Sequence, residues 1–282
     1  WTMTNRRGGV LERKQYLIAE TFSVPAVFNT AYYSEKRPLY LAMLVNNETC
    51  VKPWNEVMEI FVADLEKVDA VGAYNSMFDF KKAIPFTELY IQKLYSANYY
   101  EWEQVQRNIC RKIANEPYQK NNEKEFDCDN FSFRDNDYPL FDLWGLATTH
   151  LLNTVTYKKK CLDNDMLTAS GTYFKTSAEA SFRYLTDKYD FDEAHTALDD
   201  AIIETYILAQ IAKRSAITIG ITFFPFRELG TTNDFVLRKK NPDVQEITVV
   251  ITAMRNGIEG KNPSAYTARI ENIISELEGY LA

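Results

Sequence analysis

The segment Asp190–Glu204 reads DFDEAHTALDDAIIE and joins an acidic loop to the start of an apolar helix. His195 and Asp200 are five positions apart, so on one continuous helix their side chains would point about 140° apart. If Thr196 instead forms the N-cap, His195 lies on the preceding loop and can approach Asp200 in the first turn. A loop imidazole beside a helix carboxylate suits a general base and a metal ligand. The alternative is that these acids only charge a helix N-terminus and that His195 is a surface residue.

A second acidic segment, AYNSMFDF (Ala73–Phe80), follows an apolar run that predicts a buried strand. Asn75 and Asp79 are four positions apart, so on a helix both would face one site. Phe78 and Phe80 would anchor that helix in the core. Alone, this pattern could be an N-terminal cap with one solvated acid. The combination of a strand, this motif and a distant His-x-x-x-x-Asp that opens a helix is far more specific.

Together the two motifs resemble those of the DEDDh three-prime to five-prime exonucleases of the ribonuclease H-like superfamily, most closely the bacteriophage-encoded members. The second acidic motif of that family maps onto Asn75–Asp79 and the third onto His195–Asp200. The stretch DLWGLA (Asp142–Ala147) resembles a strand-to-helix segment between these motifs, and we assign Asp142 a positioning role. The resemblance implies an α/β fold in which helices flank a mixed five-stranded sheet that opens with three antiparallel strands.

The resemblance also implies an activity, that of a metal-dependent enzyme hydrolysing phosphodiester bonds at the 3′ ends of DNA or RNA. Four carboxylates would hold two Mg²⁺ or Mn²⁺ ions, one activating a water and the other stabilising the leaving oxygen. Asp79 and Asp200 would be two of the metal ligands, and His195 would be the general base. Asn75 and Phe78 would contact the substrate. No motif decides between DNA and RNA, because that choice depends on contacts to the 2′ position.

The first acidic motif of the family, Asp-x-Glu on the first strand, is not found. The predicted strand QYLIA (Gln15–Ala19) continues into Glu20, but Ile18 holds the place of the aspartate. Either the first carboxylate has been lost, and activity falls severely, or residues are absent from the sequence between Ala19 and Glu20. The second interpretation is favoured because only one convincing strand precedes the helix predicted at Trp54–Leu65. It is also favoured because the segment from Glu20 resembles the one after the third strand in the phage proteins. On that interpretation Glu20 is not the catalytic glutamate.

The composition is that of a globular protein with an acidic balance. The 282 residues include 32 Lys+Arg and 39 Asp+Glu, which gives a formal net charge of −7. No global positive field attracts nucleic acid or an anionic membrane, so any nucleic-acid contact must be local. No stretch approaches the roughly 18 apolar residues of a membrane span, so we expect no membrane contact and a cytoplasmic protein, in the host cytoplasm if it is phage-encoded. The four cysteines match no zinc spacing and predict free thiols.

We divide the chain into an N-terminal arm (residues 1–14), an exonuclease-like domain (15–214) and a C-terminal extension (215–282). The extension holds at least one helix, opened by Asn262-Pro263-Ser264, and could form a homo-oligomer or bind a protein partner. The missing motif leaves an alternative function open. The chain would then be a catalytically inactive exonuclease fold that acts as a nucleic-acid or protein interaction module.

Local patterns predict further features around these motifs. Thr176–Glu179 has the form of a capping box, with Thr176 accepting from the backbone N–H of Glu179. Thr196–Arg214 predicts one helix, and the helix carrying Asp79 should stop at Pro85. Two lysine runs are candidates for phosphate contact, although a solvated charge run is the simpler interpretation of each: Lys81-Lys82 and Lys158–Lys160.

Overall fold

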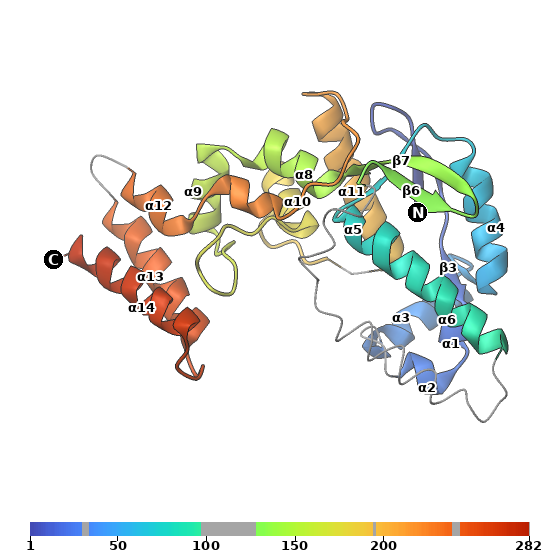
Figure 1. Ribbon diagram of the computed structural model, residues 1–282, viewed down its shortest axis with the longest axis horizontal. Helices are drawn as coiled ribbons and strands as arrows, with labels where there is room; N and C mark the ends of the chain where they lie inside the picture. Colours follow the sequence, from blue (N-terminus) through green and yellow to red (C-terminus); the bar gives the residue numbers. More distant parts are fainter. Residues whose placement is uncertain (30–33, 97–127, 194–195, 239–242, 282) are drawn as a thin grey trace. The chain divides into compact units, whose positions relative to one another are not determined.

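The computed structural model describes residues 1–29, 34–96, 128–193, 196–238 and 243–281 (Figure 1). The chain divides into two compact units. Unit 1 comprises Trp1–Asp142, Thr196–Ile202 and Ile219–Ile221, and unit 2 comprises Leu143–His195, Ile203–Thr218 and Thr222–Ala282. Both strands and helices are present, so the predicted α/β class is confirmed.

Unit 1 contains short strands and helices that alternate along the chain. Its strands are β1 (Thr2–Thr4), β2 (Val10–Arg13), β3 (Tyr16–Ile18), β4 (Cys50–Lys52), β5 (Val71–Ala73), β6 (Asn130–Phe133) and β7 (Asn136–Asp142). Its helical segments are α1 (Ala19–Phe22), α2 (Pro25–Phe28), η1 (Ser34–Lys36), α3 (Arg37–Val45), α4 (Trp54–Leu65), α5 (Ser76–Phe78), η2 (Asp79–Ala83) and α6 (Ile84–Ser96). The first turn of α11 (Ala197–Ala212) also belongs to this unit.

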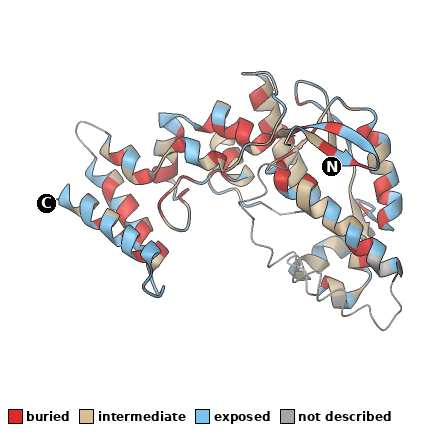
Figure 2. Ribbon diagram, in the orientation of Figure 1, coloured by how far each residue is buried: buried red, intermediate tan, exposed pale blue. Residues whose placement is uncertain are grey.

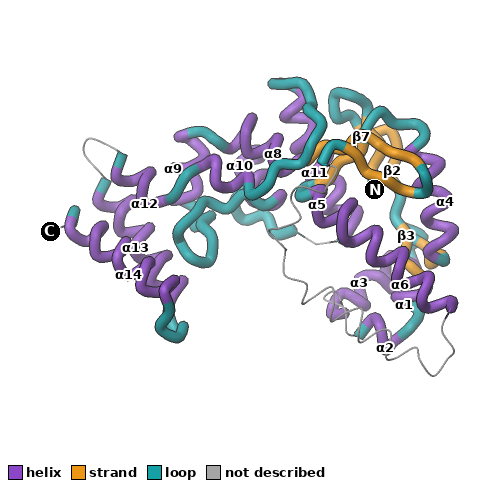
Figure 3. Tube along the Cα trace, in the orientation of Figure 1, coloured by secondary structure: helices purple, strands orange, loops and turns teal. Residues whose placement is uncertain are grey.

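The described strands form small sheets, drawn in orange in Figure 3, rather than the single five-stranded sheet that was predicted. β1 and β2 form an antiparallel pair, β3 and β4 form a parallel pair, and the order in the third sheet is β5-β7-β6. Here β5 runs parallel to β7 and β6 antiparallel to it. The predicted antiparallel opening fails because the chain enters α1 at Ala19, directly after β3. The helices between β3 and β4 form a crossover, and a crossover joins parallel strands.

The third sheet carries the core of unit 1. Arg134 and Asp135, which join β6 to β7, both have positive φ (47° and 65°), as a tight hairpin turn requires. Phe131 and Leu140 are fully buried on these strands, and α4, whose bounds match the predicted Trp54–Leu65, packs its apolar face into the same cluster. The buried residues are red in Figure 2.

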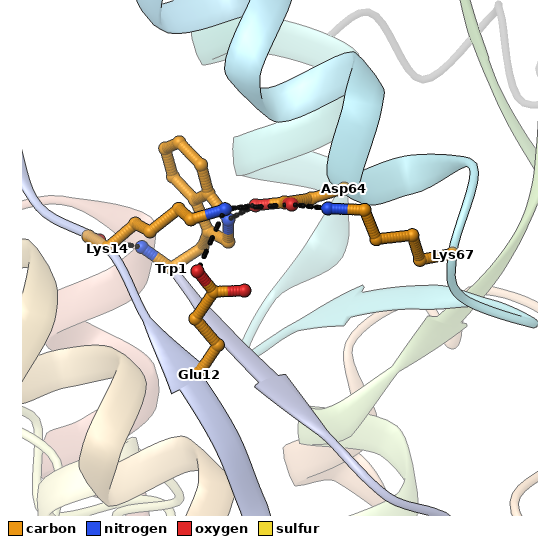
Figure 4. A network of polar contacts seen from close by, with 5 residues as sticks. All are labelled: Trp1, Glu12, Lys14, Asp64 and Lys67. Atoms are coloured by element: carbon orange, nitrogen blue, oxygen red, sulfur yellow. Dashed lines mark hydrogen bonds and ion pairs between the residues drawn. The ribbon is translucent and has the colours of Figure 1, made fainter.

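The N-terminal arm is a β1–β2 hairpin that is anchored on α4 through Asp64 (Figure 4). Asp64 is only 3% exposed. Its carboxylate accepts from Trp1 Nε1 at 2.9 Å, from Lys14 Nζ at 2.6 Å and from Lys67 Nζ at 2.9 Å, and Lys14 also pairs with Glu12. Burial alone would raise the pKa of Asp64, but the hydrogen bonds from Lys14, Lys67 and Trp1 outweigh it and hold the pKa below its usual value. The predicted arm is therefore tied to the unit by a buried ion network.

Unit 2 is helical. Its elements are α8 (Leu143–Ala147), the π-helical turn η4 (Thr148–Leu152), α9 (Val155–Asp163), α10 (Ala178–Thr186), the remainder of α11, η5 (Pro225–Leu229), α12 (Thr232–Leu237), α13 (Val244–Ile258) and α14 (Ala265–Gly279). It includes residues on both sides of the domain boundary that the sequence placed at residue 214. No helix in the described parts of the chain is long and apolar enough to span a membrane.

The helix caps of unit 2 agree with the sequence patterns in part. α14 begins after Ser264 in a capping box with Thr267, as the Asn262-Pro263-Ser264 start predicts. The N-cap of α10 is Ser177, whose side chain accepts from the backbone N–H of Ala180, so the prediction that Thr176 caps this helix is wrong. Thr176 Oγ1 instead accepts from Trp144 Nε1 at 2.9 Å. The Thr176 hydroxyl, which the local pattern assigned to the helix N-terminus, therefore binds a distant indole instead.

The extension holds α12 and α13 in addition to the predicted α14. The sequence signal for α13 is weak because Val, Ile and Thr, which dominate its central run, have low helix propensity. Asp243 caps this helix by accepting from the backbone N–H of Gln245, and Ile247 and Met254 are buried on one face. Tertiary burial of that face compensates for the low propensity.

The described cysteines Cys50, Cys128 and Cys161 are free thiols, as predicted. Burial raises the pKa of the Cys161 thiol to about 12, whereas Cys50 is exposed. Since the thiolate is the reactive form, Cys161 should resist a thiol reagent such as dithionitrobenzoate at pH 8 that labels Cys50 within minutes. Mass spectrometry of the labelled peptides measures both rates. Labelling of Cys161 as fast as Cys50 in the folded protein would contradict this burial.

Candidate active site

The helix that carries Asp79 is fixed to the third sheet by Ser76, which is fully buried. Ser76 Oγ donates to the carbonyl of Phe141 at 2.7 Å and accepts from the backbone N–H of Ala73 at 2.8 Å. The backbone N–H of Ser76 donates to Asp142 Oδ1 at 3.2 Å. Asp142, itself 2% exposed, therefore ties the start of α5 to the end of β7, and its positioning role in a reaction stays a prediction.

Asn75 and Phe78, the two predicted substrate contacts, are exposed in the turn that precedes Asp79. Asn75 has a left-handed backbone (φ 72°) and lies outside α5, so the helical spacing that was to bring Asn75 and Asp79 to one face does not apply. Phe78 is 52% exposed, so the prediction that it anchors the helix in the core is wrong, whereas Phe80, 8% exposed, does so. Both predicted contacts are accessible to a ligand.

Asp79 begins a π-helical turn, η2, that continues into α6 without a break. The prediction that Pro85 stops the helix is wrong, because Pro85 is the second residue of α6. In the π turn the backbone N–H of Ile84 bonds the carbonyl of Asp79, one residue further back than in an α-helix. This wider turn accommodates a proline ring that would clash with a carbonyl in a regular helix.

Asp200 lies in the first turn of α11, as predicted. Thr196 Oγ1 accepts from the backbone N–H of Asp199 at 3.2 Å, and the Thr196 carbonyl accepts from the backbone N–H of Asp200 at 2.9 Å. Of the two alternatives for this segment, the one with Thr196 as the N-cap is therefore observed. His195, the predicted general base, lies outside the described residues.

Asp79 and Asp200, far apart in sequence, act electrostatically on one another within unit 1. Burial raises the pKa of Asp79 to about 6, and the negative charge of Asp200 contributes to the rise, while a backbone hydrogen bond opposes it. Two partly buried carboxylates that repel each other destabilise the protein unless a cation or a proton lies with them. The two aspartates that the motifs singled out thus belong to one compact unit and interact electrostatically.

The donor chemistry of this pair fits a hard divalent cation. Carboxylate oxygens are the ligands that Mg²⁺ and Mn²⁺ prefer. In the described ranges, no cluster of three or more His, Cys, Asp or Glu side chains has the geometry of a metal site. That Asp79 and Asp200 are metal ligands therefore stays a prediction.

Glu20, which occupies the end of the missing first motif, has a structural partner. Its carboxylate is 7% exposed and accepts from the backbone N–H of Trp54 at 3.0 Å, at the start of α4, and from Tyr95 Oη at 2.6 Å. The hydrogen bond to Glu20 raises the pKa of Tyr95. α1 is one helix across the Ala19–Glu20 peptide. That the natural sequence has further residues at this position stays a prediction, checked by reading the coding sequence across it.

Glu20→Gln should lower the free energy of unfolding by about 1–2 kcal/mol, because a helix N-terminus loses a charged acceptor. If the chain is an exonuclease, as the resemblance implies, its activity under conditions where the variant is folded should stay within about twofold of the wild type. Urea unfolding and a nuclease assay on the same preparation separate the two effects. A large loss of activity with unchanged stability would instead make Glu20 a metal ligand.

A hollow in unit 1 is formed where β3, α4 and the first turn of α11 meet, and the sequence patterns did not predict it. Ile18, which holds the place of the missing aspartate, lines this hollow together with Leu198 on α11. Its other lining residues are Trp1, Lys14, Gln15, Tyr16, Val57 and Ala197. The end of β3 therefore lies beside the helix that carries Asp200.

The lysine runs are engaged with neighbouring groups. Lys81 Nζ donates to the carbonyl of Asn130 at 2.5 Å, and Lys158 Nζ donates to Asn153 Oδ1 at 3.1 Å. Lys81 and Lys158 are half-buried rather than fully solvated, and a phosphate contact of either run stays a prediction. In comparisons with known proteins, no family model matches the chain, and neither a curated protein nor a solved structure is similar enough to be matched.

Proposed function

We propose that the chain is a metal-dependent exonuclease that hydrolyses phosphodiester bonds at the 3′ ends of DNA or RNA. The observation that carries this proposal is the electrostatic interaction between Asp79 and Asp200, which come from two separate motifs and lie in the same unit. A carboxyl group whose pKa is raised by burial and by a second carboxylate, as that of Asp79 is, is typical of a functional site.

In this proposal Asp79 and Asp200 bind Mg²⁺ or Mn²⁺, and the bound ions supply an activated water and charge for the leaving oxygen. The two carboxylates fix the position of the ions, and the π turn at Asp79 and the Thr196 cap hold those carboxylates in place. His195 accepts the proton of the attacking water. Asn75 and Phe78, exposed beside Asp79, contact the terminal nucleotide.

The proposal extends to the ribonuclease H-like architecture. It is supported by the parallel pairing of β5 with β7, with Gly72 opposite Phe141. It is also supported by the hollow in which Ile18 at the end of β3 and Leu198 on α11 lie together, since the first and third motifs of such enzymes share one site. In the full fold, β3 would join the same sheet as β5.

A second candidate, the catalytically inactive fold that serves as an interaction module, is favoured by one observation. The carboxylate in the first-motif position, Glu20, binds the backbone N–H of Trp54 and the hydroxyl of Tyr95, and it is not among the groups that raise the pKa of Asp79. The two candidates differ in one measurable respect. Mn²⁺-dependent degradation of a labelled single-stranded oligonucleotide supports the enzyme, and binding without degradation by the natural full-length chain supports the module.

A further inference from the structure

Unit 2 holds a second feature suited to nucleic acid, an aromatic–arginine cluster made of Trp144, Tyr173, Phe224, Phe226 and Arg227. The Phe226 ring is at its centre. Its centroid lies 6.2 Å from that of Trp144 in a stacked arrangement, 5.0 Å from Tyr173 and 6.2 Å from Phe224, both edge-on. The Arg227 guanidinium lies 4.5 Å from the Phe224 centroid and 5.9 Å from that of Phe226.

This cluster lies at the surface rather than in the core. All four rings are partly exposed, and Arg227 is exposed. The rings are nevertheless held in place, because Trp144 Nε1 donates to the buried Thr176 and Tyr173 forms a β-bridge with Thr231. These rings are fixed in one conformation, yet part of their apolar surface stays exposed to solvent. This combination is typical of a binding surface.

The backbone at Phe224 is strained. This residue has φ 53° and ψ 49°, in the left-handed region that bulky side chains rarely adopt. Pro225 follows at the start of η5 and is buried, so the strained residue sets the direction in which the Phe224 ring leaves the chain. Such strain persists where the surrounding structure requires it, and it gathers at functional sites.

Positive charge accompanies the rings. Around Tyr173 the side chains alternate, with Phe174 and Thr176 buried and Lys175 exposed, so Tyr173 and Lys175 face outward together. Arg227, over the Phe224 and Phe226 rings, supplies a second cation. The neighbouring carboxylate of Glu228 accepts from Thr149 Oγ1 at 3.0 Å.

We propose that this cluster binds an unpaired stretch of single-stranded nucleic acid, with bases stacked on the rings and phosphates held by Arg227 and Lys175. Every base has an aromatic face, so this contact is independent of sequence, as an enzyme that shortens strands of any sequence requires. A guanidinium that already lies on two rings also offers its outer face to a base. The choice of nucleic acid as the ligand rests on the proposed function. The inference assigns binding of the single strand to unit 2.

The test uses two variants and two probes. Phe224→Gly removes a ring at a position where glycine adopts the backbone without strain, so the fold should be kept. Arg227→Gln removes only the charge. Arg255→Gln, which changes an exposed arginine of unit 2 that pairs with Glu278, is the matched control. The probes are a fluorescein-labelled oligothymidylate, whose binding is followed by anisotropy in EDTA, and the p-nitrophenyl ester of thymidine 5′-monophosphate, whose hydrolysis is followed in Mn²⁺.

We expect Phe224→Gly and Arg227→Gln each to weaken oligothymidylate binding about tenfold, with Arg255→Gln unchanged. Hydrolysis of the small ester should stay at the wild-type rate in all three. Wild-type binding by the two cluster variants would overturn the inference, and ester hydrolysis by the same preparations would leave the proposed function intact. Weakened oligothymidylate binding in the two cluster variants supports the inference whether or not the wild type hydrolyses the ester. If the wild type does not hydrolyse the ester, the proposed function is contradicted and the inference is not. If the two cluster variants differ from the wild type in sedimentation coefficient but not in oligothymidylate binding, the cluster is a contact between protein chains and the inference is overturned.

Discussion

Asp79→Asn and Asp200→Asn should each lower Mn²⁺-dependent degradation of a labelled oligonucleotide about a thousandfold or more. Each substitution keeps the shape of the side chain but removes a carboxylate that the proposed metal site requires. The two losses should not add, because both residues serve one site. Single-turnover rates at saturating Mn²⁺ measure the effect on chemistry.

Folding provides the control for this prediction. Asp79 is a partly buried acid whose pKa is raised to about 6, so the neutral amide should leave the thermal midpoint at pH 7 without metal equal to or above that of the wild type. Asp69→Asn, which changes an exposed aspartate of unit 1 paired with Arg6, should leave activity unchanged. Full activity in either Asp79→Asn or Asp200→Asn would remove these carboxylates from the mechanism.

Asp64→Asn should lower the free energy of unfolding by about 3 kcal/mol, the largest effect on stability that we expect. The carboxylate is 3% exposed and accepts from three donors, and its loss leaves the Lys14 ammonium, 17% exposed, without its main counter-charge. Urea unfolding measures the change. Asp69→Asn again is the control, because its surface pair with Arg6 should contribute no more than about 1 kcal/mol.

The Asp64 network also predicts a pH dependence. The folded pKa of Asp64 is lowered, so the carboxylate contributes its full stabilisation above the unfolded pKa of about 3.9 and loses it as the pH falls through the lower folded pKa. The difference in unfolding free energy between wild type and Asp64→Asn should therefore be constant near neutral pH and shrink below about pH 4. A difference that is unchanged down to pH 2 would contradict the role of the ion network.

Local signals predicted the helices that hold the site. The spacing of apolar residues predicted Trp54–Leu65 with the observed bounds, and the N-cap at Thr196 was one of two alternatives for the helix that carries Asp200. These features depend on residues within about one helical turn of each other, so the local sequence is enough to predict them. The wrong cap at Thr176 shows the limit of such signals, because a distant indole, Trp144, takes the hydroxyl.

Long-range pairing could not be predicted in the same way. The parallel partner of β3 is β4, and Glu20 binds a backbone N–H that is 34 residues away at Trp54. The motif spacing singled out Asp79 and Asp200. The raised pKa of Asp79 depends on burial, which cannot be derived from the spacing of residues in the sequence. The aromatic–arginine cluster joins rings from three segments that lie far apart in the sequence, so no local pattern predicts it.

The most direct test of the proposed function is the product pattern from a single-stranded oligonucleotide labelled at its 5′ end and incubated with the protein and Mn²⁺. We predict a ladder of labelled products that shorten one nucleotide at a time from the 3′ end, absent in EDTA and in the Asp79→Asn variant. An intact oligonucleotide after incubation with the folded wild type, or the same ladder with Asp79→Asn, would contradict the proposed function.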